Sequence, residues 1–193
     1  MRLLILSLLL FISLFSKSQD TVRIRHTEYV TVFSKSLKYP VLVQWWTTKA
    51  KVSCATPLKR ADSFGPDPSL PKDSDLGLDY KGSGLDRGHV TPAADNLCNG
   101  LKVMQECFYF TNMIPQYHAL NAGDWKTLET LTRDLAAQKD SVMVWAGAIG
   151  AKSKIGRVSV PTICWKVIYV KADKKYEAYI FNNTADKQTG LVS

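Results

Sequence analysis

Apolar residues recur at spacings of three and four in the second half of the sequence. This period predicts an amphipathic helix of about four turns that begins near Asn121, and Asp124 is a candidate N-cap or first-turn acid for it. The apolar positions that carry the period are Trp125, Leu128, Leu131 and Leu135.

Runs rich in β-branched and aromatic residues predict strands instead. They are Tyr39–Thr48, Val142–Trp145, Ile163–Val170 and Tyr176–Phe181. The proline-rich stretch Pro57–Asp75 is typical of a long surface loop. Strands, then one prominent helix, then strands again favour an α+β fold with an antiparallel β-sheet core over alternating βαβ units.

The first residues have the layout of a targeting segment. One positive charge at Arg2 precedes the apolar run Leu3–Phe15, and small residues follow at Ser16 and Ser18, as in a secretory signal. The alternative is a membrane anchor, but this run is short of the roughly 20 residues that a spanning helix needs. We therefore expect a signal peptide over 1–18, a domain over 19–193, and a secreted or periplasmic protein with no membrane attachment in the mature form.

The four cysteines, Cys54, Cys98, Cys107 and Cys164, lie outside that segment. Their spacing does not resemble a zinc site, and an oxidising compartment would allow two disulfides. The alternative is four buried thiols. We expect Cys98–Cys107, which closes a short loop, and Cys54–Cys164, although pairing cannot be deduced from sequence.

The composition limits the class of protein without assigning a function. Hydrophobic residues make up 46% of the chain and charged residues 22%, which excludes a disordered tail or a fibrous protein. Lys and Arg number 25 against 17 Asp and Glu, a formal net charge of +8. This balance favours an anionic partner such as nucleic acid, although many secreted proteins are basic without a specific partner.

Candidate chemistry is concentrated in the segment Asp86–His89. His89 can accept a proton from water near neutral pH, the guanidinium of Arg87 can bind two phosphate oxygens at once, and Gly88 allows close approach of the backbone. The alternative for these four residues alone is a turn at a strand end with a surface ion pair.

A second group lies on the predicted helix. Asn121, Trp125, Glu129 and Arg133 recur every four residues and so share one stripe of its surface. Trp125 would lock the helix against the sheet, and Glu129 and Arg133 could form an ordinary surface ion pair. Asn121 is less easily explained as structural, because an amide oxygen at a helix start suits Mg²⁺ or Ca²⁺.

Taken together, these two segments resemble the DNA/RNA non-specific endonucleases, also called ββα-metal or His-Me finger nucleases. The resemblance rests on the run Asp86–Asp95, then Asn112, Pro115-Gln116, Asn121, Trp125, Glu129 and Arg133 in order. It implies an antiparallel sheet with a ββα-metal motif. It also implies a further strand and helical segment after Phe181, whereas this sequence ends at Ser193, so either a short version of the domain or a truncated reading frame is expected.

The resemblance also implies roles for individual residues. His89 would be the general base that activates water, and Asn121 the direct protein ligand of one Mg²⁺ ion, or of Mn²⁺ or another divalent ion. Glu129 would orient water on the metal, and Arg87 and Arg133 would hold the scissile phosphate. Two further roles are implied: Asn112 would help to position the site, and Arg60 would be an additional phosphate contact.

The sequence therefore predicts a secreted Mg²⁺-dependent endonuclease that hydrolyses DNA and RNA without base recognition, because its cations bind phosphates. Its rate should fall below the ordinary pKa of His89, about 6.5. The alternatives are a secreted nucleic-acid-binding protein without catalysis, which would not need a general base, and an exported disulfide protein whose motif is coincidental. The sequence identifies no inhibitor protein and no oligomeric state.

Overall fold

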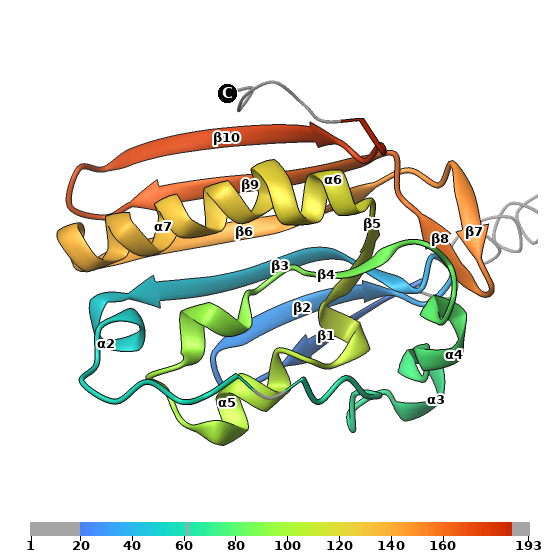
Figure 1. The fold of residues 1–193 in the computed structure, drawn as a ribbon, viewed down its shortest axis with the longest axis horizontal. Helices are drawn as coiled ribbons and strands as arrows, with labels where there is room; N and C mark the ends of the chain where they lie inside the picture. Colours follow the sequence, from blue (N-terminus) through green and yellow to red (C-terminus); the bar gives the residue numbers. More distant parts are fainter. Residues whose placement is uncertain (1–19, 61, 187–193) are drawn as a thin grey trace, which may run out of the picture.

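A six-stranded antiparallel sheet forms the frame of the protein (Figure 1), in a computed structural model that describes residues 20–60 and 62–186. The predicted signal peptide, residues 1–18, lies outside the described residues. The sheet order is β1-β2-β3-β6-β9-β10. The strands are β1 (Thr21–Arg25), β2 (Tyr29–Ser34), β3 (Tyr39–Thr48), β6 (Ser141–Ile149), β9 (Ile163–Val170) and β10 (Lys175–Asn182). The predicted α+β fold with an antiparallel core is confirmed.

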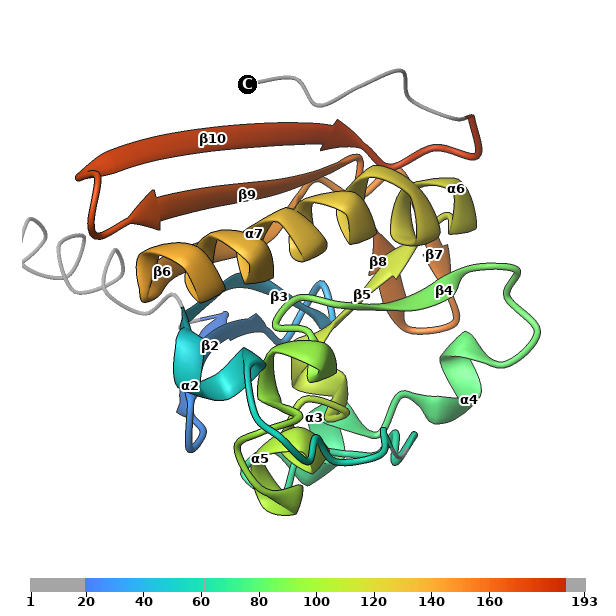
Figure 2. The ribbon, with the colours of Figure 1, turned by 60° about the vertical axis from the view of Figure 1, so that its left-hand side comes forward.

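The remaining elements gather on one face of this sheet (Figures 1 and 2). Two short ladders join β4 (Asp86–His89) to β5 (Met113–Gln116) and β7 (Ser153–Ile155) to β8 (Val158–Val160). The helical segments are α2 (Lys49–Val52), α3 (Pro71–Ser74), α4 (Gly77–Tyr80), η1 (Ala93–Asn96), α5 (Leu101–Glu106), η2 (Phe110–Asn112), α6 (His118–Leu120), η3 (Asn121–Trp125) and α7 (Lys126–Lys139).

The four predicted strands are all present. β3 and β9 have the predicted bounds, whereas β6 extends to Ile149 and β10 is one residue longer at each end. The missed strands β1 and β2 form one edge of the sheet, and β4 contains the whole Asp86–His89 motif. In β9, buried residues alternate with partly exposed ones, as a strand with one face on the core requires.

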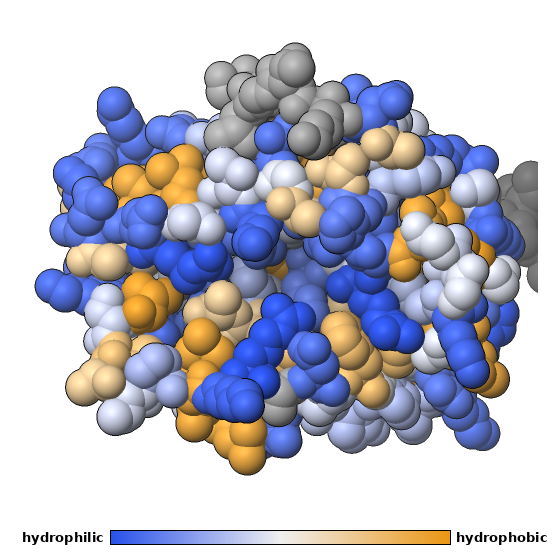
Figure 3. Space-filling view, viewed as in Figure 1, coloured by the Kyte–Doolittle hydropathy of each residue, from blue (hydrophilic) through white to orange (hydrophobic). Residues whose placement is uncertain are grey.

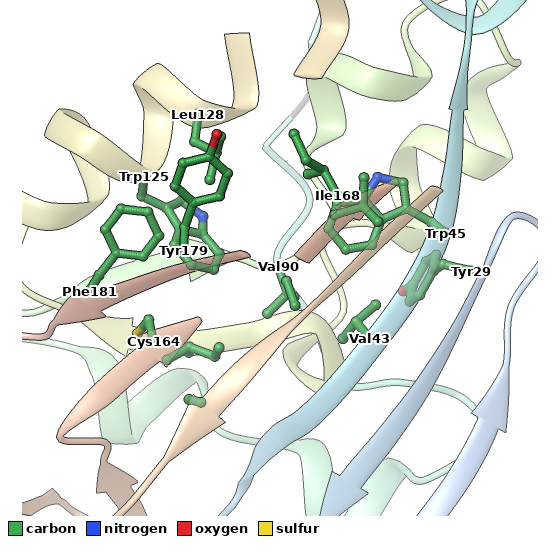
Figure 4. Packing of buried hydrophobic residues seen from close by; sticks show 14 of the residues in the cluster. Tyr29, Val43, Trp45, Val90, Trp125, Leu128, Cys164, Ile168, Tyr179 and Phe181 are labelled. Atoms are coloured by element: carbon green, nitrogen blue, oxygen red, sulfur yellow. The ribbon is translucent and has the colours of Figure 1, made fainter. Parts of the chain in front are cut away.

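The long helix α7 packs its apolar stripe on β3, β6 and β9. Figure 4 shows Trp125 and Leu128 pointing toward Tyr179 and Phe181 of β10, and the Trp125 and Phe181 rings meet edge to face at 5.7 Å. One position of the predicted stripe is wrong, because Leu131 is exposed, and Thr132 and Ala136 are buried instead. The buried face therefore runs at four-residue steps from Leu128.

The start of the helix also differs from the prediction. The helical path begins at His118, and Asn121–Trp125 forms a π-helical turn in which Gly123 has non-helical dihedrals (φ −97°, ψ −117°). Asp124 lies inside this turn and does not cap α7. A π-turn within a helix is commonly found at functional sites, and this one contains the predicted metal ligand Asn121.

The predicted disulfides are wrong. Cys54 pairs with Cys98, with a Cα–Cα distance of 5.7 Å, and Cys107 and Cys164 are buried thiols. The physical reason is tertiary: Cys54 follows α2 and Cys98 follows η1, and these two elements are in contact. The bond closes the segment that contains Arg60, Arg87 and His89. The Pro57–Asp75 stretch is mostly irregular as expected, but it contains α3 and the fully buried Asp67.

Candidate active site

A cavity of about 290 Å³ opens between α7 and the segments that precede β5. From the side shown in Figure 1, Figure 3 shows hydrophilic side chains around a hollow in the centre of the molecule. Six of the seven predicted site residues line this cavity, and Asn112 is the exception. The full lining is Arg60, Arg87, His89, Pro92, Ala93, Ala94, Asn121, Ala122, Lys126, Glu129 and Arg133.

The β4–β5 ladder positions the first two of these side chains. Its register pairs Arg87 with Pro115 and His89 with Met113. Since alternate residues of a strand point to the same side, Arg87 and His89 share a face, and both contact Phe64: the Arg87 guanidinium lies 5.0 Å from its ring centroid and the His89 ring 5.6 Å. The pairing of two strands therefore aims a cation and a candidate base into one cavity.

His89 is held by apolar contacts. Its ring packs edge-on against Phe108 at 4.8 Å, and its buried Nε2 has no hydrogen-bond partner among the described residues. Burial, reinforced by the Arg60 cation, lowers the pKa of His89 to about 3. The expectation of an ordinary value near 6.5 is therefore wrong, and the imidazole is neutral, and able to accept a proton, through the physiological range.

Gly88 lies between Arg87 and His89 on β4, at a position with no room for a side chain. A Cβ atom added there would lie 1.9 Å from Oε1 of the buried Gln116. The β4–β5 pairing thus depends on glycine for close approach rather than for a left-handed conformation.

Asn121 is oriented by Asp86, the first residue of β4. The Asn121 Nδ2 donates a hydrogen bond to Asp86 Oδ2 at 2.8 Å, and His118 Nδ1 lies 2.8 Å from the same oxygen. Because Asp86 engages the amide nitrogen, the side-chain oxygen is the atom of the Asn121 amide left to bind a cation. The motif residue Asp86, for which the sequence suggested no role, is thus a positioning residue.

Glu129 and Arg133 do not form the ion pair that their spacing allows. Arg133 instead lies 3.3 Å from Oδ1 of the buried Asp95 and donates to Thr130 Oγ1. Burial raises the pKa of Glu129 to about 7, and the nearby Lys166 cation is the largest influence in the opposite direction. Glu129 therefore lines the cavity without the predicted partner, and burial shifts it toward its protonated form near neutral pH.

Asn112, which the sequence predicts to help position the site, lies outside the cavity lining: this fully buried amide accepts from Thr91 N and donates to the carbonyls of Thr91 and Cys107. It fixes the chain just after β4 and does not reach the cavity. Arg60 lies in the lining, where it packs over Phe108 at 5.2 Å and pairs with Asp62 at 2.8 Å.

Sequence reasoning missed Lys126, Asp95 and Lys166. Lys126 is an exposed residue of the lining, and its helical spacing from Ala122 and Glu129 was a signal that could have identified it. Asp95 ends the run that carries the resemblance but was given no role, and Lys166 gave no usable local signal, because their partners come from other elements: Asp95 accepts from Trp45 Nε1 and Thr47 Oγ1 of β3.

Other features of the described residues do not compete as catalytic sites. A hollow of about 600 Å³ lies between α4 and the β7–β8 ladder, but its Asp79 and Arg157 form an ion pair at 2.7 Å and its lining includes no histidine. Within residues 20–60 and 62–186, no three His, Cys, Asp or Glu side chains are grouped to hold a metal ion. No helix in this part of the chain is long and apolar enough to cross a membrane.

Comparison with known proteins agrees with this geometry. Residues 9–192 match the model of the DNA/RNA non-specific endonuclease family. Nuclease EXOG of Homo sapiens is 30% identical over 76% of this chain and 43% of its own length. Nuclease C1 of Cunninghamella echinulata is 37% identical over 67% of this chain and 59% of its own length. A crystal structure of an EndoG/EndoGI complex, described as showing the mechanism of EndoG inhibition, has a TM-score of 0.79 at 28% identity and covers 89% of this chain and 80% of that chain.

The same comparison corrects the predicted location. Relatives from frog, zebrafish, mouse, human and fission yeast are named as mitochondrial nucleases, so the prediction of a secreted or periplasmic protein is wrong. The chain spans less than two thirds of the length of these relatives, for example 34% of Nuclease EXOG of Xenopus laevis.

Proposed function

Since the chain belongs to the DNA/RNA non-specific endonuclease family, we propose that it hydrolyses phosphodiester bonds in DNA and RNA, with His89 as general base and Asn121 as ligand of a divalent cation. The observation that carries this proposal is the convergence of His89, Asn121, Glu129 and the arginines on one cavity. A protein that only binds nucleic acid has no need of a neutral, buried imidazole beside an amide and a carboxylate.

His89 takes the proton of the attacking water. Its low pKa keeps the imidazole neutral, and the Phe64 and Phe108 rings fix its plane, so the base is pre-positioned. A neutral imidazole can accept a proton without being deprotonated first.

The arginines bind the phosphate. The Nε of Arg87 is buried without a hydrogen-bond partner among the described residues, which leaves a donor for a phosphate oxygen, and Arg133 and Arg60 line the same wall. Guanidinium groups neutralise the charge that develops on phosphate oxygens during hydrolysis. Because such contacts read the backbone rather than base edges, they support action on DNA and RNA alike.

The donor set fits Mg²⁺. Asn121 offers an amide oxygen and Glu129 a carboxylate, which are hard oxygen ligands, and Mg²⁺ is commonly held by one or two protein groups, with water and substrate phosphate completing its shell. When bound, the ion would supply Lewis-acid stabilisation of the phosphate and the leaving oxygen. Asn121 would hold it directly, and Glu129 would orient water beside it. Mn²⁺ fits the same donors.

A plasmid-nicking assay with Mg²⁺ or EDTA tests this proposal. His89→Ala should lower the rate by roughly 10²–10⁴-fold, the usual contribution of a positioned base, while the variant still retards nucleic acid in gels. Asn121→Ala should recover part of its activity when Mg²⁺ is raised, whereas His89→Ala should not. Asn99→Ala, outside the cavity lining, serves as the control and should cleave like the wild type.

The rival is a nucleic-acid-binding protein without catalysis. It predicts binding with no Mg²⁺-dependent nicking, and no difference in cleavage between His89→Ala and the wild type. Full wild-type activity in EDTA, or nicking by His89→Ala at the wild-type rate, would contradict the proposed mechanism.

A further inference from the structure

The outer face of the six-stranded sheet, which points away from α7, has no helix or further strand over it among residues 20–60 and 62–186. The other elements gather on the inner face, which carries the cavity (Figures 1 and 2). Alternate residues of a strand point to the same face, so the register assigns the outward positions. One outward row crosses all six strands and consists of Arg25, Val30, Gln44, Trp145, Val167 and Ala178.

Aromatic rings are concentrated at one end of this outer face. The neighbouring row pairs Trp46 with Met143, Met143 with Tyr169, and Tyr169 with Tyr176. The Tyr176 ring stacks on that of Tyr169 at 4.5 Å and lies 6.4 Å from that of Trp145, at interplanar angles of 29° and 26°. Tyr176 is 66% exposed and Trp46 38%. A contiguous exposed patch of large apolar side chains marks an interaction site.

A hollow of about 180 Å³ lies beside this aromatic end. Its lining includes Gln44 and Trp46 of β3, and Arg25 and Glu28 at the turn between β1 and β2. Glu28 is paired with Lys51 at 2.6 Å, whereas Arg25 is exposed and forms no ion pair with a carboxylate of the described residues. The hollow therefore places an unpaired guanidinium beside an exposed indole.

The charges around the outer face are basic. The outward positions of β2, β3, β6, β9 and β10 carry no charged residue. The exposed cations at the edges are Arg23 and Arg25 of β1 and Lys171 and Lys174 of the β9–β10 turn. The acid in that turn, Asp173, is already paired with Lys139 at 3.1 Å. An uncharged aromatic face with cations at its edges suits an anionic ligand that also carries flat rings.

We propose that the outer face is a second binding site for single-stranded nucleic acid, with bases stacked on Tyr176 and Trp46 and phosphates held by Arg25 and Arg23. This deepens the proposed nuclease function, on which it rests, by adding a substrate contact outside the catalytic cavity. Proteins that bind single strands without sequence preference combine aromatic stacking with cations along the backbone. The bases of a duplex are stacked on one another, so the free rings favour a single strand.

Fluorescence anisotropy in EDTA with an oligothymidylate of about 15 nucleotides, the upper range of such binding sites, tests the proposal. Tyr176→Ala should raise the Kd about fivefold or more, the effect of losing one base–aromatic stack. Trp46→Ala, on another strand, should act in the same direction. Tyr176→Phe keeps the ring and should bind like the wild type. Ile180→Ala, on the same strand and face and 58% exposed, is the matched control and should also bind like the wild type.

A duplex of the same length separates base stacking from charge. Tyr176→Ala should leave the Kd of the duplex unchanged, because paired bases are not free to stack on the ring. Arg25→Ala should weaken binding of the single strand and reduce the slope of log Kd against log salt by about 0.7, the value for one phosphate of a single strand. Lys81→Ala, at an exposed cation after α4, should leave that slope unchanged.

Three results would overturn the proposal. An unchanged Kd in both Tyr176→Ala and Trp46→Ala would show that the single strand does not bind this face. Equal losses for single strand and duplex would show that the rings do not stack on bases. Sedimentation that finds a wild-type dimer and a Tyr176→Ala monomer, with the same Kd for the oligonucleotide, would make this face an interface between copies of the chain.

Failure of the proposed function has a different result. A wild-type protein that does not nick plasmid in Mg²⁺ would refute the nuclease function. Because binding is measured in EDTA, the oligonucleotide experiments would still decide whether the outer face binds single strands.

Discussion

The indole Nε1 of Trp125 donates a hydrogen bond to the backbone oxygen of His89 at 3.0 Å. One bond therefore joins the first turn of the active-site helix to the end of the strand that carries the candidate base. Because Trp125 is also buried against Phe181 and Lys166, the position of His89 relative to Asn121 and Glu129 depends on this side chain.

Replacing that indole tests the link. Trp125→Phe keeps an aromatic ring but removes the donor, so we expect a loss of about 1–3 kcal/mol in the free energy of unfolding and a roughly 10- to 100-fold lower nicking rate from misplacement of the base. Urea unfolding and plasmid nicking measure the two effects. Trp46→Phe, at a side chain that is 38% exposed, is the control, and equal behaviour of the two variants would contradict the link.

Gly88 offers a test of the strand pairing. Gly88→Ala should cost about 1–3 kcal/mol through overpacking, because the new methyl would collide with Gln116. The second substitution Gln116→Ala removes the atoms in the way, so the double variant should be more stable than Gly88→Ala alone. Gly77→Ala, where the nearest atom would be 3.8 Å away on Phe110, should lose nothing. Thermal or urea unfolding measures these differences in stability. A Gly88→Ala protein as stable as the wild type would contradict the close contact.

The buried imidazole should make stability depend on pH. The pKa of His89 is about 3 in the folded protein and about 6.5 when unfolded. Below pH 6.5 the unfolded chain binds a proton at this histidine that the folded chain does not, so His89 should lower the free energy of unfolding by up to about 1.4 kcal/mol per pH unit as pH decreases toward 3. Glu129, whose pKa is raised from 4.5 to about 7, contributes the opposite slope between those two values, so the effect of His89 is measured as a difference between variants.

Urea unfolding of the metal-free protein across this range measures the slope. His89→Asn should lose the His89 contribution and so differ in slope from the wild type, whereas His118→Asn, at a side chain that is 79% exposed, should not. The same slope in His89→Asn as in the wild type would show that His89 titrates normally.

Lys126 should contribute to binding but not to sequence preference. Its exposed ammonium lines the cavity, where it can neutralise one phosphate. Lys126→Ala, made in the inactive His89→Ala protein, should reduce the slope of log Kd against log salt by about 0.9, equally for DNA and RNA. Lys139→Ala, at the other end of α7 and paired with Asp173 at 3.1 Å, should not change the slope. A loss confined to one base composition would contradict backbone recognition.

Local pattern was sufficient for the central strands and the main helix. Alternation and β-branched content defined β3 and β9, and three- and four-residue spacing defined α7, because both signals come from side chains that one face of a single element must bury. The motif Asp86–His89 and the helix spacing of Asn121, Glu129 and Arg133 also predicted residues that line one cavity, since each group lies on one strand or one continuous helical path.

What the sequence could not determine depends on contacts between elements far apart in the chain. Cys54 pairs with Cys98 because α2 meets η1, and Arg133 turns from Glu129 to Asp95 because η1 brings a buried carboxylate within 3.3 Å. The low pKa of His89 and the buried charge of Lys166 arise from desolvation by several elements at once. The sequence by itself determined which residues could do the chemistry, and the tertiary structure decided which charges face one another, because pairing and desolvation are properties of the packed chain.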